Sequence, residues 1–222
     1  MTKEREHNPF HKLCDVEDRF VAGHIFGRPD TKITTVYIVK EGLLSVTVPL
    51  AHGGEVEAAL IGPGGIAGAR VAFGCSHWFN SVVAQTSGVA WVVDMVKFTT
   101  AVRENYTLQK CSFQHELWIS LQAQQTAACN AVHPLPARMS TWLLRAHDLT
   151  GSNEFHFTHE YISEMLGAQR VSISIAAIEM RRRGLIRYRR ASVAIQDRSG
   201  LEHEACECYL AVRAAQEEIF RH

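Results

Sequence analysis

The sequence predicts an α+β protein of two parts joined by a long helix, and three observations carry this prediction. Residues 19–93 alternate short β-like runs with glycine turns. Residues 94–130 contain neither proline nor glycine, as expected of one continuous helix. Residues 155–190 have the pattern of two short helices around a glycine, followed by a basic β-segment. At 222 residues the chain is long enough for two small domains.

The N-terminal half is expected to form a β-sandwich or barrel, because many short strands separated by glycine turns favour these architectures. Glycine-rich turns are expected near Gly42, Gly53 and Gly64. The runs expected to form strands are 34–39, 43–48, 56–61, 81–85 and 89–93.

Apolar and small residues recur along the predicted long helix at spacings of four and three. Part of this helix must pack on the β-rich half, while the alternation of bulky and small residues also favours a partner helix. Pro134 then breaks the pattern and suggests a hinge, and residues 135–147 form the next helix, with Trp142 and Leu143 in its core. The sequence therefore predicts a homodimer formed through residues 110–132, with an interface of Phe113, Leu117, Leu121, Gln124 and Ala128.

The C-terminal half has the parts of a protein that reads the major groove of DNA. Thr158 is a candidate N-cap for a short helix, and Gly167 can end that helix with a positive φ. A second helix opens at residues 168–170 and ends at Gly184, followed by a β-rich segment with several arginines. The apolar positions expected to face inward are Ile162, Met165 and Leu166 on the first helix, and Ile173, Ala176, Ala177 and Met180 on the second.

Charge supports this interpretation. The net charge of the chain is zero, but residues 130–200 hold ten arginines, no lysine and six acidic residues, a local excess of four positive charges. A helix pair around a glycine is common, and an arginine triplet such as 181–183 often marks only a solvated helix end. The order of the parts, together with the local charge, favours DNA binding.

The motif of Thr158, Ile162, Leu166, Gly167 and Arg170 resembles the C-terminal domain of the cAMP receptor protein/FNR superfamily of bacterial transcription regulators. The run 206–209 also resembles the tail of a rhizobial-type subgroup. This resemblance implies a cyclic-nucleotide-binding-like β-roll with a hairpin around Gly42, a long dimerisation helix and a winged helix-turn-helix. The implied domains are 1–108, 109–133 and 134–222.

The resemblance also implies which residues contact DNA. Arg170 matches a base-contacting arginine, whereas Val171 and Ile175 stand where other members carry Glu and Arg, so a different half-site is expected and Val171 could touch a thymine methyl. Gln169 and Ser174 are further candidate base readers. The remaining candidates, most of them for phosphate contacts, are Thr158, His159, Ser172, Arg189 and Arg190.

Members that bind cyclic nucleotides hold the phosphate with an Arg-Ser pair. In this chain Phe79 or Asn80 stands at the position of that arginine, and only the serine of the pair is kept, as Ser81. Arg70 could replace the missing charge, but is expected to be a surface residue. The sequence therefore predicts no response to cAMP, with a pocket that either holds another effector or is filled by Phe73, Trp78 and Phe79.

Other cofactor sites find little support in the sequence. Only Cys14 lies where some members bind an iron–sulfur cluster, and Cys75-Ser76-His77 is a weak candidate for haem and gas sensing. Cys206 and Cys208 are too close for the usual zinc half-site, and no second half is evident. We therefore expect no metal and no cofactor, and the effector is unknown.

No enzyme class is indicated, since the chain lacks the His-x-His, GxSxG, P-loop and HExxH motifs. No catalytic residue is therefore proposed. The chain has no long apolar run and a polar N-terminus, and its six scattered cysteines fit reduced thiols in a cytoplasm rather than disulfides. The partners expected are a palindromic double-stranded DNA operator, RNA polymerase and a second copy of the chain, with no membrane.

Overall fold

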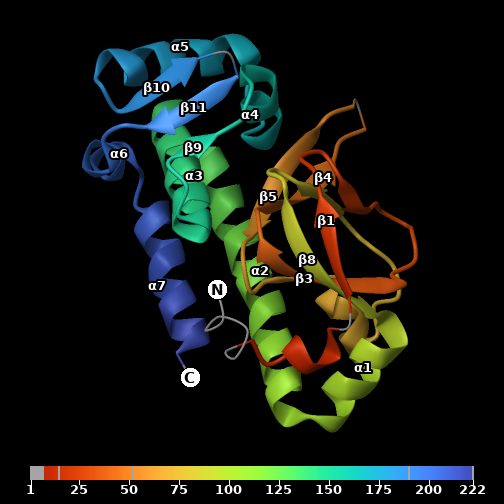
Figure 1. Ribbon diagram of the computed structural model, residues 1–222. Helices are drawn as coiled ribbons and strands as arrows, with labels where there is room; N and C mark the ends of the chain where they lie inside the picture. The colour runs from red at the N-terminus through yellow and green to blue at the C-terminus, as the bar shows by residue number, and fades with distance from the viewer. Residues whose placement is uncertain (1–7, 15, 52, 190, 222) are drawn as a thin grey trace. The chain divides into compact units, whose positions relative to one another are not determined.

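The computed structural model describes residues 8–14, 16–51, 53–189 and 191–221 and confirms the α+β class (Figure 1). The chain divides into two compact units, which are described separately. One unit comprises Met1–Val46, Leu60–Ser120 and Ile219–His222, and the other comprises Thr47–Ala59 and Leu121–Glu218. Among the described residues, no helix has the length and apolar character needed to span a membrane.

The N-terminal half contains two four-stranded sheets, ordered β1-β8-β3-β6 and β2-β7-β4-β5. All five predicted strand runs are confirmed, each to within about two residues. Two 3-10 turns, η1 and η2, complete this region. The bounds are η1 His11–Leu13, β1 Val16–Phe20, β2 Ile25–Gly27, β3 Thr35–Glu41, β4 Leu44–Pro49, β5 Glu55–Ile61, β6 Ile66–Ala67, η2 Ala69–Phe73, β7 Ser81–Ala84 and β8 Gly88–Asp94.

The prediction that the strands on either side of Gly42 pair with each other as a hairpin is wrong. β3 and β4 flank Gly42 but belong to different sheets, and β3 instead pairs with β8 and β6. Gly42 turns the chain from one sheet into the other with a φ of 100°, a conformation that L side chains rarely adopt. A Cβ at this position would also lie 3.0 Å from the backbone oxygen of Ser87.

Trp78 is a buried aromatic side chain that packs against Gly27 of β2 and Gly68, the residue after β6. It is 6% exposed and packs on Gly27 so closely that a Cβ there would lie 2.2 Å from its ring. The burial predicted for Trp78 is confirmed, but that predicted for Phe73 and Phe79 is wrong, because these side chains are 43% and 63% exposed. The large indole occupies the space that two glycines, Gly27 and Gly68, leave free, and the phenylalanines lie outside it.

The helix predicted for residues 94–130 is interrupted. Helix α1 (Met95–Glu104) is separated from α2 (Tyr106–Val132) by Asn105, which has extended backbone angles. The Asn105 side-chain oxygen accepts hydrogen bonds from the backbone N–H groups of Thr107 and Leu108, at 3.0 and 3.2 Å. Asparagine is a strong N-cap residue, so a break is possible here without proline or glycine.

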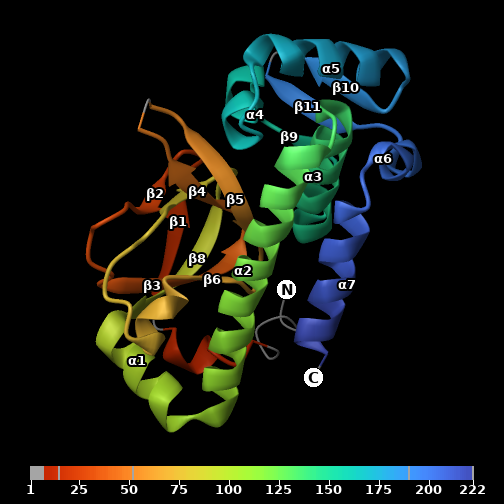
Figure 2. The same cartoon turned by 180° about the vertical axis from the view of Figure 1, so that it is seen from behind.

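The second unit contains the predicted helix pair and hairpin, which lie together at one end of it (Figure 2). The seven apolar positions expected to face inward are all buried. Strands β10, β11 and β9 form a small sheet in that order, and two helices not anticipated, α6 and α7, follow it. The bounds are α3 Leu135–Thr150, β9 Glu154–Phe155, α4 His159–Met165, α5 Arg170–Arg182, β10 Ile186–Arg189, β11 Ser192–Ile195, α6 Arg198–Glu204 and α7 Cys208–Phe220.

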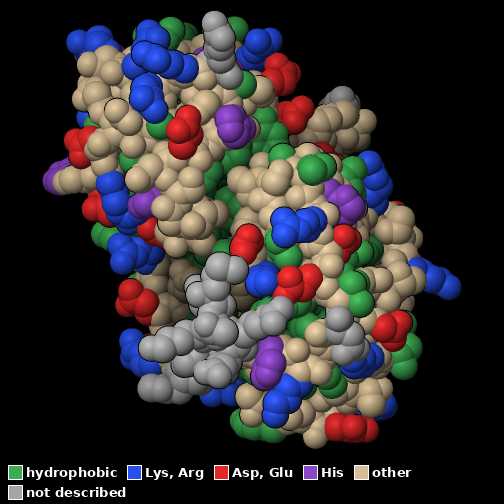
Figure 3. Space-filling model, viewed as in Figure 1, with side chains coloured by type: hydrophobic (Ala, Val, Ile, Leu, Met, Phe, Trp, Pro, Cys, Tyr) green, Lys and Arg blue, Asp and Glu red, His purple; other side chains and the backbone are tan. Residues whose placement is uncertain are grey.

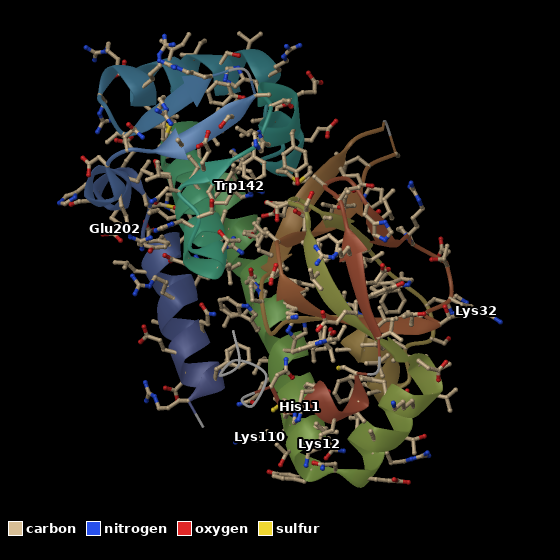
Figure 4. The ribbon with its side chains drawn as sticks, viewed as in Figure 1. His11, Lys12, Lys32, Lys110, Trp142 and Glu202 are labelled. Atoms are coloured by element: carbon tan, nitrogen blue, oxygen red, sulfur yellow. The ribbon has the colours of Figure 1, made fainter. Side chains whose placement is uncertain are left out.

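Trp142 projects from α3 into the core of this unit (Figure 4). It is 3% exposed, and its ring centroid lies 4.9 Å from that of Phe157, which stacks in turn on Phe155 at 5.1 Å. The predicted core role of Trp142 is confirmed. This aromatic stack holds α3 against the chain segment that leads into α4, and so supports the helix pair.

Candidate nucleic-acid interface

Helix α4 begins and ends at the residues that the sequence indicates. The Thr158 hydroxyl accepts a hydrogen bond from the backbone N–H of Tyr161 at 3.0 Å, as an N-cap residue does. Gly167 adopts a positive φ of 55° immediately after the helix, and α5 starts three residues later at Arg170. The predicted helix-turn-helix geometry is thus built by local capping and one glycine. The hydroxyl of Thr158 serves the cap, so a DNA contact by Thr158 stays a prediction.

The outward face of α5 is unusually apolar. Val171, Ile175 and Ile178 recur at i, i+4 and i+7 and are 68%, 65% and 56% exposed. Water is a poor environment for such a stripe, whereas thymine methyl groups in a major groove offer an apolar partner. Exposed Gln169 and Arg170 lie at the start of the same helix, so polar and apolar groups able to contact bases occur side by side.

Arg170 is available to a DNA partner. Its guanidinium lies 3.4 Å from the Glu160 carboxylate on α4, but both side chains are more than 60% exposed. An exposed ion pair of this kind contributes little to stability and can be exchanged for another partner at small cost. Ser172, two residues further along α5, is half-buried.

Ser174 and His159 are bonded to each other rather than presented to solvent. The Ser174 hydroxyl lies 2.9 Å from Nδ1 of His159 and 3.0 Å from the backbone oxygen of Arg170. The imidazole also packs on Tyr188, with centroids 4.3 Å apart. Burial, reinforced by Arg170, lowers the pKa of His159 and favours its neutral form. The DNA contacts predicted for Ser174 and His159 stay predictions.

The β10–β11 hairpin presents arginines on one side. Arg187 and Arg189 are exposed on the same face of β10, while Tyr188 points the other way and donates to the Phe157 oxygen at 2.6 Å. Ala191, with a φ of 67°, lies in the hairpin turn. Arg190 falls outside the described residues. Several basic side chains, all of them arginines in this part of the sequence, gather over α5 and the hairpin (Figure 3), which suits a phosphate-binding surface.

The predicted dimer stripe lies on an uncovered face of α2. Phe113 and Leu117 are 59% and 44% exposed, which is high for large apolar side chains. Leu121 is half-buried, and Gln124 and Ala128 are exposed. The other faces of the same helix are buried, through residues such as His115, Trp118, Ile119 and Gln122.

Arg70 is not the surface residue that the sequence suggests. Its guanidinium lies 3.3 Å from the Glu116 carboxylate on α2, and both side chains are 22% exposed. It also lies over the ring of Phe79, at 5.6 Å from the centroid. Burial raises the pKa of Glu116 more than the neighbouring Arg70 lowers it. The positive charge that could have replaced the missing phosphate-binding arginine already has a carboxylate partner.

Buried His115 lies beside this pair. Its Nε2 accepts a hydrogen bond from the backbone N–H of Ile66 at 3.3 Å, which requires a neutral ring. Burial lowers the pKa of His115 to about 4. In the segment Cys75-Ser76-His77, the weak candidate for a haem site, Nδ1 of His77 lies 2.9 Å from the Ser76 hydroxyl, at hydrogen-bond distance.

Within the part of the chain that the structure describes, one group of potential metal ligands comes together that the sequence analysis misses, formed by Cys129, His133, Cys206 and Cys208. Their ligand atoms all lie within 4.8 Å of one another. The missing half-site is Cys129-x-x-x-His133, whose spacing places both side chains on one face at the end of α2. Burial raises the pKa of the Cys129 and Cys208 thiols.

Two domain families match the chain, a cyclic nucleotide-binding domain over residues 17–105 and a Crp-like helix-turn-helix domain over residues 137–204. No curated protein matches it. A transcriptional regulator of the CRP family from Thermus thermophilus is similar in structure, with a TM-score of 0.73, 22% identity, and coverage of 85% of this chain and 96% of that one. FixK2 from Bradyrhizobium japonicum is similar with a TM-score of 0.73, 15% identity, and coverage of 86% and 97%. The c-di-GMP-responsive regulator CLP from Xanthomonas campestris is similar with a TM-score of 0.66, 16% identity, and coverage of 88% and 98%.

Proposed function

The chain belongs to the CRP/FNR family of transcription regulators, and from this membership we propose that it is a sequence-specific DNA-binding regulator that acts as a homodimer and does not respond to cAMP. The expected domains are 1–108, 109–133 and 134–222. It is proposed to be a cytoplasmic protein without enzymatic activity that acts with RNA polymerase at a palindromic operator.

The outward face of α5 is the observation that carries DNA binding. Val171 and Ile175 are exposed on the helix that begins at Arg170, and Arg187 and Arg189 are exposed on β10 of the same unit. An apolar stripe facing water would be costly in a protein without a partner for it. A major groove supplies thymine methyls for the stripe, guanine edges for Arg170 and phosphates for Arg187 and Arg189.

The proposal of a homodimer is supported by Phe113 and Leu117, which leave apolar surface uncovered on α2. Because palindromic operators mirror a two-fold axis, a dimer through α2 would present two copies of α5 to two half-sites. The absence of a cAMP response is supported by the Arg70–Glu116 pair, since a cyclic phosphate would have to displace the carboxylate. An effector of another chemistry, including a haem-bound gas, remains the alternative.

Selection of binding sites from random duplex DNA, followed by gel-shift measurement, tests the proposal. Enrichment of an inverted repeat, bound by a dimer and preferred by at least about a thousandfold over random DNA, is expected. A selection that yields no repeat, with binding that depends on salt but not on sequence, would contradict it.

A further inference from the structure

We propose that Cys129, His133, Cys206 and Cys208 form a mononuclear zinc site that joins the C-terminal end of α2 to the start of α7, with Cys206 in the loop between α6 and α7 and Cys208 as the first residue of α7. The domain match ends at residue 204, so Cys206 and Cys208 lie just beyond it. The proposal goes beyond the proposed DNA-binding function and does not depend on it.

Two pairs of ligand atoms already have the spacing of neighbouring ligands around one tetrahedral ion. The Sγ atoms of Cys129 and Cys206 are 3.5 Å apart, and Sγ of Cys208 is 3.5 Å from Nδ1 of His133. Zinc–sulfur bonds of about 2.3 Å and zinc–nitrogen bonds of about 2.0 Å place neighbouring tetrahedral ligands roughly 3.5–3.8 Å apart. The set of three sulfurs and one nitrogen is one that zinc prefers in closed structural sites.

The histidine is oriented as a metal ligand would be. Nδ1 of His133 faces Cys208, while its Nε2 lies 3.1 Å from the Glu207 carboxylate. An Nε2–H group held by a carboxylate fixes the tautomer that leaves Nδ1 free to bind a metal. This arrangement of carboxylate, imidazole and metal is a recurrent feature of zinc sites.

Two of the cysteine sulfur atoms have hydrogen-bond partners on neighbouring helices. Gln125 Nε2 donates to Sγ of Cys208 at 3.1 Å, and the Thr141 hydroxyl lies 3.3 Å from Sγ of Cys206. All three cysteines are less than a tenth exposed. Cys129 and Cys208 also line a small cavity, with about 30 Å³ of space for water-sized groups.

Positive side chains also lie near the thiols. Zinc would displace the three thiol protons to the solvent, so that Zn²⁺, three thiolates and a neutral imidazole carry a net charge of −1. Arg138 interacts electrostatically with Cys129 and Cys206, and Arg145 with Cys129 and Cys208. These two cations offset the charge of the zinc–thiolate centre within the protein.

The surrounding structure holds the segment around Cys206 and Cys208 against the end of α3. Tyr209, next to Cys208, donates to Asp148 at the end of α3 at 2.8 Å, and Arg198 on α6 binds the same carboxylate at 2.7 Å. Glu202, labelled in Figure 4, extends this network. Its carboxylate lies 3.1 Å from the guanidinium of Arg198. Zinc would cross-link segments 75 to 77 residues apart in the sequence, next to the proposed hinge at Pro134.

Elemental analysis of the full chain, produced with zinc and purified without chelators, tests the site. One zinc per chain is expected, with loss of the metal in Cys208→Ser and its retention in the control Cys75→Ser, whose thiol belongs to the other compact unit. Glu207→Gln is expected to keep the site but weaken zinc affinity by about 10–100-fold.

Cobalt substitution of the unaltered chain provides a readout that does not depend on whether a variant folds. A tetrahedral cobalt–thiolate spectrum with one equivalent of Co²⁺, reversed by zinc, is expected. The proposal is overturned if cobalt gives no thiolate charge-transfer band, if Cys208→Ser binds zinc like the unaltered chain, or if the freshly purified protein contains a Cys129–Cys206 disulfide instead.

Discussion

The guanidinium of Arg70 lies 3.3 Å from the carboxylate of Glu116, a pairing that links the short turn η2 to helix α2 within the same unit. Two residues of opposite charge thus occupy the region where relatives of this fold would need a positive charge for a cyclic phosphate. Arg70 would lose this partner if it turned to a ligand, which would leave a largely buried carboxylate unpaired.

From this pairing we expect calorimetry to detect no specific binding of cAMP or cGMP at micromolar ligand. Phe79 and Asn80 offer no cation where cyclic-nucleotide binders carry arginine, so the phosphate would lack a counter-charge. The same titration on Glu116→Gln, which releases Arg70, serves as a comparison. A micromolar Kd for the unaltered chain would show that another group neutralises the phosphate.

His115 predicts a specific dependence of stability on pH. Its pKa is lowered from about 6.5 to about 4 by burial, so the unfolded chain binds a proton between these values and the folded chain does not. Stability contributed by neutral His115 is therefore complete above pH 6.5, falls between pH 6.5 and about 4, and falls no further below that. The loss is about 3 kcal/mol across this window, at about 1.4 kcal/mol per pKa unit.

Urea denaturation from about pH 7 to about pH 4 measures this dependence. His115→Gln is the matched variant, because a neutral amide can still accept from Ile66 but cannot titrate. A flatter pH profile is expected for the variant than for the unaltered chain. Identical slopes in the two chains would show that other groups account for acid destabilisation.

The dimer interface is tested by Leu117→Lys combined with Leu121→Lys. Two charges on the apolar stripe of α2 would be buried without partners in a dimer, so monomers without operator binding are expected. Sedimentation measures the oligomeric state. Val96→Lys combined with Leu210→Lys is the control, since both residues are exposed apolar side chains on other helices and the dimer should persist. An intact dimer in the Leu117/Leu121 variant would refute the assignment.

The apolar stripe of α5 predicts that thymine methyl groups contribute to recognition. Thymines in each half-site are replaced one at a time by deoxyuridine, which lacks the methyl group. One of these replacements should weaken binding of the unaltered chain, because Val171 contacts that methyl. The same replacement should not weaken binding of Val171→Ala. Gel shifts on the paired oligonucleotides give the comparison. Equal losses for the two proteins would place the methyl contact elsewhere, with Ile175 as the next residue to test.

The sequence predicts the helix-turn-helix well because its determinants are local. Thr158 and Gly167 act within a few residues of their own positions, and the inward apolar residues of α5 follow helical periodicity. Asn105 is an example of a residue that this reasoning misses. The absence of proline and glycine predicts one continuous helix over residues 94–130, but the side chain of Asn105 caps a new helix and so interrupts it. The Arg70–Glu116 pair and the four-residue thiol–imidazole group are not predictable in this way, because they join segments 46 and about 75 residues apart.

The most direct test of base reading compares Arg170→Ala with Arg189→Ala on operator and random DNA over a range of salt concentrations. A bidentate contact from Arg170 to guanine is worth about 1–3 kcal/mol of discrimination, so Arg170→Ala should weaken operator binding selectively and relax preference at one base pair per half-site. Arg189→Ala should weaken all sequences alike and reduce the salt slope by about one unit. Equal loss of affinity for operator and random DNA in Arg170→Ala would contradict the account.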